Sequence, residues 1–125
     1  MRLLLDTHAL LWWLTSDPTL SGAASAAIAD EGNAVYVSAA TAWEISIKRA
    51  IGKLESPGDL EAQVKWHRFD PLPITLRHAL AAGGLPHHHE DPFDRMLVAQ
   101  AMAEGLTIAT RDPRIPLYGV PTLAA

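Results

Sequence analysis

The sequence begins with RLLLDTHALLWWL at residues 2–14, a stretch in which an apolar run, an acidic residue and a second apolar segment follow one another. The run at 2–5 is typical of a buried strand in a parallel sheet. It ends at Asp6, and the segment from Ala9 to Leu14 is predicted to be a helix. A buried strand that leads directly into a helix is the building unit of α/β folds, so this stretch predicts that fold class.

The same alternation continues along the chain. Further strands are predicted at 34–37 (AVYV), 71–74 (PLPI), 106–110 (LTIAT) and, as a short strand, near Val120. Helices are predicted at 20–32, from Ser38 or Thr41 to 52, from near Pro57 to 69, at 75–84, and from Asp91 to just before Gly105. We therefore expect a three-layer α/β fold with a central, mostly parallel sheet of about four to five strands flanked by helices.

Length and composition limit the class of protein. The 125 residues, of which 49% are hydrophobic, predict one globular domain over 1–125. The absence of cysteine excludes disulfides and thiol catalysis and fits a reducing, cytoplasmic location. Asp6 and His8 interrupt the apolar N-terminus, and no apolar run is long enough to span a membrane. A net charge of −4 means that any nucleic-acid chemistry needs cations placed at the site itself.

Four acidic residues are predicted to meet at one edge of the sheet. Asp6 directly follows the first strand, and Glu44 lies early in the helix after the second. Asp94 lies in the first turn of its helix, and Asp112 follows the strand at 106–110 by two residues. The carboxyl ends of parallel strands and the starts of the following helices share one edge, so these four side chains should be neighbours.

The stretch HEDPFDR at 89–95 also has a purely structural interpretation. Asp91 before Pro92 is typical of a helix N-cap, and Asp94 at the third helical position suits the helix dipole. Asp6 and Asp112 could likewise be a strand-end residue and a turn residue. We assign Asp91 mainly to capping, with a supporting role at the site as the alternative.

A cluster of carboxylates needs compensation, because two unit charges about 4 Å apart repel by roughly 4 kcal/mol at an effective dielectric constant of about 20. Oxygen ligands without cysteine favour Mg²⁺ or Mn²⁺, which would offset the repulsion, activate water and stabilise charge on a phosphoryl oxygen. Arg95, Arg111 and Lys48 are candidates for holding the flanking phosphates of RNA, although each could also be an ordinary surface cation.

The histidine and tryptophan residues are explained most simply by structural roles. His87, His88 and His89 cannot all face one ion, so we interpret them as a solvated loop in which His89 could touch a substrate. Trp43, in the apolar stripe of the helix that carries Glu44, is expected in the core. Trp12 and Trp13 point about 100° apart on their helix, so one should be buried and one partly exposed.

Four segments together carry a resemblance to a known family: LLLDTHALLW, VSAATAWEISIKRAIGKL, HEDPFDRMLVAQAMAEGLTIATRD and YGVP. With them the chain resembles PIN-domain proteins, specifically the VapC-type toxins of bacterial type II toxin–antitoxin systems. The resemblance implies a PIN-like fold in which Asp6, Glu44, Asp94 and Asp112 are the catalytic and metal-binding quartet. It further implies supporting hydrogen bonds from Thr7 and Thr110.

The same resemblance implies an activity and partners. VapC-type toxins are similar to one another in being Mg²⁺- or Mn²⁺-dependent endoribonucleases that cut structured RNA such as tRNA, are inhibited by a small VapB-like antitoxin, and commonly form homodimers. Two other functions stay open from the sequence. One is a PIN module that binds RNA or an antitoxin without cleavage, and the other is a small phosphoesterase of a different kind.

Overall fold

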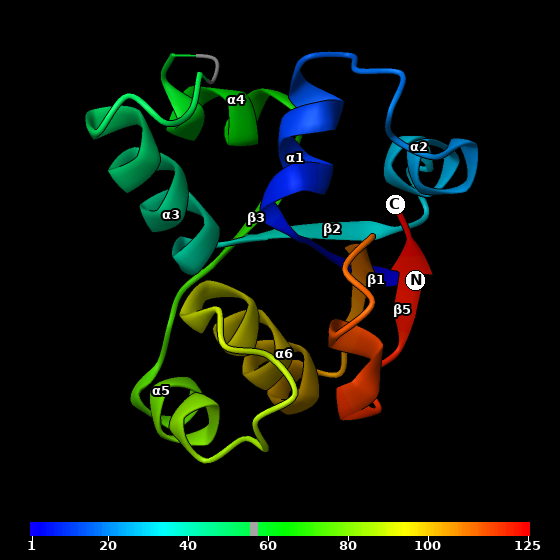
Figure 1. Ribbon diagram of the computed structural model, residues 1–125. Helices are drawn as coiled ribbons and strands as arrows, with labels where there is room; N and C mark the ends of the chain where they lie inside the picture. The colour runs from blue at the N-terminus through cyan, green and yellow to red at the C-terminus, as the bar shows by residue number, and fades with distance from the viewer. Residues whose placement is uncertain (56–57) are drawn as a thin grey trace.

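The computed structural model describes residues 1–55 and 58–125 (Figure 1). Its centre is one five-stranded sheet. The strands are β1 (Arg2–Leu5), β2 (Ala34–Ser38), β3 (Asp70–Leu72), β4 (Thr107–Thr110) and β5 (Thr122–Ala124). They lie in the order β3-β2-β1-β4-β5, and every neighbouring pair is parallel. The predicted α/β class with a parallel sheet is confirmed.

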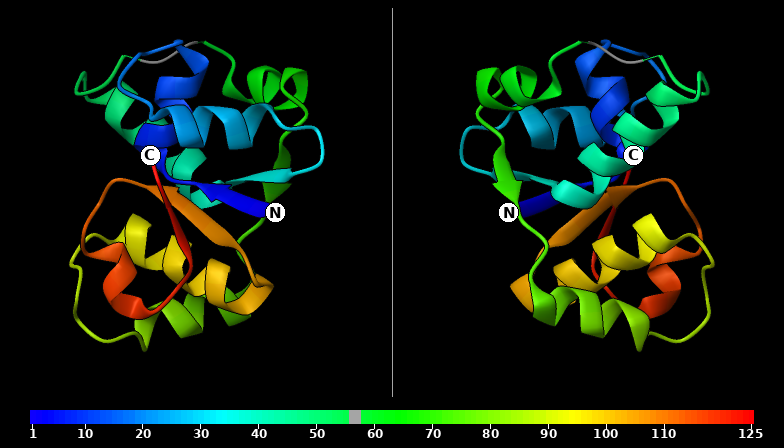
Figure 2. Two further views of the ribbon diagram at one scale, coloured as in Figure 1. Left: turned by 90° about the vertical axis from the view of Figure 1, so that its right-hand side faces the viewer. Right: turned by 90° about the vertical axis from the view of Figure 1, so that its left-hand side faces the viewer.

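Helices cover both faces of this sheet, as Figures 1 and 2 show. One face carries α1 (Thr7–Leu14), α2 (Gly22–Ala29), α3 (Ala39–Ala50) and α4 (Leu60–Trp66). The other carries α5 (Leu76–Gly83), α6 (Pro92–Glu104) and the 3-10 helix η1 (Ile115–Tyr118). The three predicted layers are therefore present. In the described part of the chain, no helix is long and apolar enough to cross a membrane.

Several predicted boundaries differ in the structure, among them that of the strand expected at 71–74, which lies at Asp70–Leu72. The short strand expected near Val120 lies slightly later, at Thr122–Ala124, where it pairs with β4. The helix start expected near Pro57 falls outside the described residues. In the described part this helix follows Asp59, whose side chain accepts a hydrogen bond from the Ala62 N–H.

β1 is the centre of the hydrophobic core. Leu3, Leu4 and Leu5 are completely buried. Successive side chains of a strand point to opposite faces, so Leu3 and Leu5 pack into the apolar cluster under α1 and α2 while Leu4 packs into the cluster under α6. The apolar run seen in the sequence is thus required by burial on both faces of the sheet.

The chain changes direction across the sheet beside β1. From β1 it proceeds through β2 to β3 on one side, and then returns to build β4 and β5 on the other side. In open parallel sheets the crevice outside the carboxyl ends of the strands at such a point is the usual ligand site. Asp6 follows β1 and Asp112 follows β4 at this crevice, and the Asp6 N–H donates to the Ala109 carbonyl at 3.1 Å.

Polar caps start the helices at this same edge. Asp6 Oδ1 accepts from the Ala9 N–H at 2.8 Å to begin α1, and Ser38 Oγ accepts from the Ala40 N–H at 3.0 Å to begin α3. Asp91 caps α6 ahead of Pro92, as the sequence predicted. Each strand-to-helix connection here is therefore short, and functional side chains on the first helical turns stay close to the sheet.

Trp43 corrects the expectation for α3. It was expected in the core, but its side chain is 62% exposed, and it makes an edge-on ring contact with Phe93 at 5.6 Å. The apolar stripe that includes Ile47 and Ile51 faces outward with it. The helix instead buries a side that includes Glu44 and Ile45, because the site occupies the space between α3 and the sheet edge.

A buried polar network joins the start of α3 to α6 at the end of β2. Ser38 Oγ donates to Gln100 Oε1 at 2.6 Å, and Gln100 Nε2 donates to the Pro73 carbonyl at 3.3 Å. Ser38 and Gln100 are both completely buried. Because α3 carries Glu44 and α6 carries Asp94, this network fixes the two helices that bring those acids together.

We expect Gln100→Leu to lower the free energy of unfolding by about 1–3 kcal/mol, because it leaves the buried Ser38 hydroxyl without its acceptor. Gln63→Leu on α4, where the glutamine is only partly buried, is the matched control, and we expect it to change stability by less than about 0.5 kcal/mol. Urea unfolding measures both. Equal effects of the two substitutions would contradict the structural role assigned to Gln100.

Candidate active site

Asp6 directly follows β1 at the edge of the sheet, where its backbone is hydrogen-bonded to β4. Its side chain is only 6% exposed. Burial raises its pKa above the ordinary value, while hydrogen bonds from the Thr110 side chain and the Ala9 N–H oppose that shift. Both donors come from elements that the fold places around the strand ends. Asp6 is therefore a buried acid whose ionised form depends on the groups that surround it.

Glu44 reaches the same crevice from α3. It is 6% exposed and accepts two short hydrogen bonds, from Thr7 Oγ1 and from Lys48 Nζ, each at 2.5 Å. Thr7 is the first residue of α1, so this contact ties the starts of α1 and α3 together. Lys48 stands one turn beyond Glu44 on α3, and its hydrogen bond to Glu44 raises the pKa of the ammonium group.

Asp94 shows how closely the acids approach one another. The pKa of Asp94 is raised to about 7, chiefly by burial and then by the neighbouring charge of Asp91 and the smaller effects of Asp6 and Glu44, while the charge of His89 opposes the rise. These carboxylates come from three separate parts of the sequence, because Asp91 and Asp94 belong to one segment. The shift is the electrostatic signature of a crowded acidic site.

Asp112 completes the edge from the loop after β4. Burial raises its pKa, but hydrogen bonds from the Arg114 N–H and from His89 outweigh burial, so that the pKa is lowered overall. The Arg114 N–H donates to Oδ1 at 2.8 Å, and His89 Nε2 lies 2.6 Å from Oδ2. Asp112 is thus ionised more readily than Asp94 on the opposite side of the crevice.

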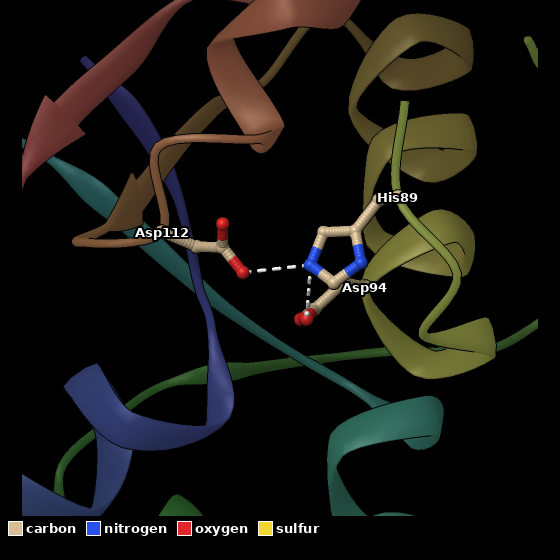
Figure 3. A group of neighbouring side chains, drawn as sticks. All are labelled: His89, Asp94 and Asp112. Atoms are coloured by element: carbon tan, nitrogen blue, oxygen red, sulfur yellow. Dashed lines mark hydrogen bonds and ion pairs between the residues drawn. The ribbon is translucent and has the colours of Figure 1, made fainter. Parts of the chain in front are cut away.

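His89 lies between these last two acids, as Figure 3 shows. Its Nε2 is 3.1 Å from Asp94 Oδ2 in addition to the contact with Asp112. The Asp91 backbone N–H donates to Nδ1 at 3.1 Å, so Nδ1 is an acceptor and the proton of the neutral ring is on Nε2. In this arrangement His89 bridges the two carboxylates as a hydrogen-bond donor.

The position of His89 corrects the solvated-loop interpretation of the three histidines. His87 and His88 are exposed, but His89 is only 5% exposed. The loop folds back because the His89 N–H donates to the Tyr118 hydroxyl at 3.0 Å. The sequence pattern that predicts where the acids lie does not predict that His89 is buried among them. Only its place directly before the Asp91 cap brings it within reach of the acids.

The side chains at this edge fit a divalent cation. One ligand atom each from His89, Asp94 and Asp112 lies within 4.8 Å of the others. The carboxylate oxygens are the hard ligands that Mg²⁺ and Mn²⁺ prefer, and the raised pKa of Asp94 marks uncompensated negative charge. With Nδ1 of His89 accepting from the Asp91 N–H, Nε2 is the donor to the two carboxylates, so the carboxylate oxygens are the atoms that a cation would find available.

The predicted supporting residues lie around these acids. Thr7 is hydrogen-bonded to Glu44, as described above. Thr110 Oγ1 accepts from the Asp112 N–H at 3.0 Å and so shapes the loop that carries this acid. Asp91 Oδ1 accepts from the N–H groups of Phe93 at 2.8 Å and Asp94 at 3.1 Å, which is the geometry of a cap.

The three cations predicted to bind RNA differ in their surroundings. Lys48 is 41% exposed beside the acids and could reach a substrate. Arg95 instead donates to the backbone carbonyls of Ala82 and Leu85, each at 3.0 Å, and holds the loop after α5. Arg111 donates to the Thr19 and Ala125 carbonyls and lies over the Trp12 ring. An RNA contact by any of the three stays a prediction.

Comparison with known proteins defines the class. A family model described as PIN domain matches residues 3–120. The chain belongs to the PIN-domain family. Ribonuclease VapC22 of Mycobacterium tuberculosis is 32% identical over 120 residues, which cover 90% of this chain and 88% of that protein.

Solved structures share the fold at lower sequence identity. VapBC from Salmonella typhimurium bound to DNA superposes with a TM-score of 0.68 at 19% identity, covering 98% of this chain and 97% of that chain. A toxin–antitoxin complex from Klebsiella pneumoniae gives 0.63 at 20% identity, covering 97% and 95%. These likenesses agree with the three-layer arrangement described above.

Asp94→Asn should stabilise the metal-free protein, and more so at pH 8 than at pH 5. The folded pKa of about 7 lies above the ordinary value of 3.8, so Asp94 lowers the stability of the fold progressively as the pH rises from about 4 to 7. Thermal unfolding in EDTA at the two pH values measures this. Ser21→Ala, which removes the cap of α2, is the control and should lower the unfolding temperature similarly at both.

Two substitutions of Asp91 should distinguish its role as a helix cap from the effect of its charge. We expect Asp91→Ala to lower the free energy of unfolding by about 1 kcal/mol, because the cap of α6 is lost. Asp91→Asn keeps an acceptor oxygen for the cap and removes a charge beside Asp94, so its stability in EDTA should equal or exceed that of the parent. If both variants lose stability equally, the carboxylate charge and not the cap is what α6 requires.

Proposed function

We propose that this protein is a metal-dependent endoribonuclease that acts as the toxin of a type II toxin–antitoxin pair. The observation that supports the proposal is the group formed by Asp94, Asp112 and His89, with Asp6 and Glu44 near enough for their charges to raise the pKa of Asp94, in a PIN-domain fold. The 32% identity to Ribonuclease VapC22 supports RNA as the substrate class. The proposal takes residues 1–125 as one PIN domain.

The four acids would hold the cation through their carboxylate oxygens. When bound, Mg²⁺ or Mn²⁺ would lower the pKa of a water nucleophile and stabilise negative charge on the phosphodiester. It would also reverse the sign of the local field, since an acidic crevice repels a polyanion by itself. The proposal covers either ion.

The other polar side chains would keep the acids in place. Thr7 orients one oxygen of Glu44, and His89 holds Asp94 and Asp112 at a fixed separation through its Nε2–H. Lys48 is hydrogen-bonded to Glu44, and its raised pKa keeps the ammonium charged at neutral pH. We assign Lys48 to a phosphate oxygen of the RNA, because its exposed ammonium is the cation next to the site.

A VapB-like antitoxin is the proposed protein partner. The Klebsiella pneumoniae structure with this fold is a toxin–antitoxin complex. In this chain, the concentration of carboxylates around Asp6 and Asp94 would accept a basic side chain of the antitoxin, and arginine matches carboxylates in a bidentate manner. A homodimer is also part of the proposal, with the outward-facing apolar side chains of α3 as available surface.

Purified protein should cleave a tRNA transcript in Mg²⁺ or Mn²⁺ and stop when EDTA is added. We expect Asp94→Asn to lower the cleavage rate by at least about a hundredfold, because it removes a ligand whose charge the cation requires. Asp70→Asn, on the exposed strand β3, is the matched control and should cleave like the parent. Gel analysis of end-labelled RNA measures all three.

The same experiment distinguishes the other functions. Cleavage that persists in excess EDTA, with contaminating ribonuclease excluded, would contradict metal dependence. RNA binding without any cleavage would indicate a binding module, and turnover of small phosphate esters in place of RNA would indicate a different phosphoesterase. Normal cleavage by Asp94→Asn would leave Asp94 as a helix-start residue only.

A further inference from the structure

A surface hollow of about 520 Å³ adjoins the acidic crevice at Asp112. It lies between the exposed side of α1 and the loop after β4. The residues that line it are His8, Trp12, Arg111, Asp112, Pro113 and Arg114. Its volume is within the range of roughly 300 to 1,000 Å³ that is usual for small-ligand sites. Because Asp112 belongs to both, whatever occupies the hollow is next to the proposed reaction site.

One side of the hollow is aromatic. The rings of His8 and Trp12 are stacked, with centroids 5.7 Å apart and an interplanar angle of 28°. They stand four residues apart on α1 and therefore share one side of the helix. Arg111 lies 4.7 Å from the Trp12 centroid, and its hydrogen bonds to two backbone carbonyls hold it there. Trp12 is thus fixed, while His8 is exposed at the surface.

The other side of the hollow carries the guanidinium group of Arg114. The Arg114 backbone N–H is hydrogen-bonded to Asp112, but within residues 1–55 and 58–125 its guanidinium group has no hydrogen bond or ion pair. Its side chain is exposed. The guanidinium groups of Arg95 and Arg111 donate hydrogen bonds to backbone carbonyls. Arg114 is therefore the arginine near the acids that is available to an anion.

We propose that this hollow binds one nucleotide of a single-stranded segment of RNA, with the base stacked on His8 beside Trp12 and its phosphate on Arg114. The inference rests on the proposed ribonuclease function and adds to it the place where a nucleotide next to the cut is held. Aromatic platforms and a nearby cation are the usual means of binding unpaired nucleotides without base pairing. Because the chain has a net charge of −4, attraction of RNA needs a local combination of this kind, an aromatic ring with a cation beside it.

RNA binding in EDTA tests the hollow apart from cleavage. This separation matters because His8 also lowers the pKa of Asp6, so a change in rate alone would be ambiguous. The probe is a short fluorescein-labelled single-stranded RNA, and fluorescence anisotropy at several salt concentrations gives its dissociation constant. We expect His8→Ala to weaken binding about tenfold and His8→Phe, which keeps a ring, to restore it.

The salt dependence separates the two halves of the site. Arg114→Ala should weaken binding and lower the slope of log Kd against log salt by about 0.7, the value for one phosphate contact on a single strand. Arg114→Lys should restore the slope. His8→Ala should leave the slope unchanged, because stacking releases no counterions.

Two surface residues elsewhere serve as controls. Trp66, which is 80% exposed on α4, matches His8 as an exposed aromatic residue, and Arg77 on α5 matches Arg114 as an exposed arginine. Alanine at either position should leave RNA affinity unchanged. Equal weakening by Trp66→Ala or Arg77→Ala would overturn the proposal, as would unchanged affinity of both hollow variants or no binding of RNA by the parent.

The two proposals fail in different ways. If the parent cleaves RNA in Mg²⁺ but His8→Ala and Arg114→Ala bind it normally, the ribonuclease function stands and the hollow is not a nucleotide site. If the hollow variants weaken binding while the parent never cleaves RNA, the nucleotide site stands and the ribonuclease function is wrong.

Discussion

β1 pairs in parallel with β2 on one side and with β4 on the other, and the rest of the molecule depends on this arrangement. Its three leucines are completely buried and alternate between the two layers of the core, so neither the position nor the register of the strand can shift without exposing them. Because all the strands are parallel, their carboxyl ends lie on one edge. The fold therefore brings Asp6 and Asp112 together as a consequence of core packing, and the helices that begin at the same edge add Glu44 and Asp94.

The site that results is costly in the absence of a cation. Four acids and the capping Asp91 share a partly buried space, and the raised pKa of Asp94 reflects the desolvation and repulsion that remain. The protein offsets part of this cost with its own donors: Thr7 and Lys48 on Glu44, and His89 between Asp94 and Asp112. These contacts orient the oxygens of the acids as well as compensating their charge. A divalent ion would complete the compensation, which is why the proposed chemistry follows from the electrostatics of the fold.

The arginines near the acids divide between structure and exposure. Arg95 satisfies carbonyls at the end of α5, and Arg111 closes the C-terminal strand against the turn after α1. Backbone carbonyls at such turns need donors, and a guanidinium group with five N–H bonds can serve several of them. The guanidinium group of Arg114, on the exposed loop between β4 and η1, donates to no backbone carbonyl of residues 1–55 and 58–125. Besides Lys48, the surface next to the site thus has an available positive charge on Arg114, a residue that the sequence motifs do not single out.

The sequence by itself determined the succession of strands and helices along the chain and the helix cap at Asp91, because these depend on local periodicity and on local capping chemistry. It narrowed the start of α3 to Ser38 or Thr41, of which Ser38 is the cap in the structure. It gave no access to the burial of His89, the outward direction of Trp43 or the structural use of Arg95. Those features were decided by tertiary structure, since they depend on which groups from distant segments meet: Tyr118 against the His89 loop, the acidic site beneath α3, and the carbonyls after α5. Local patterns specify which way a side chain can point, but only packing specifies what it finds there.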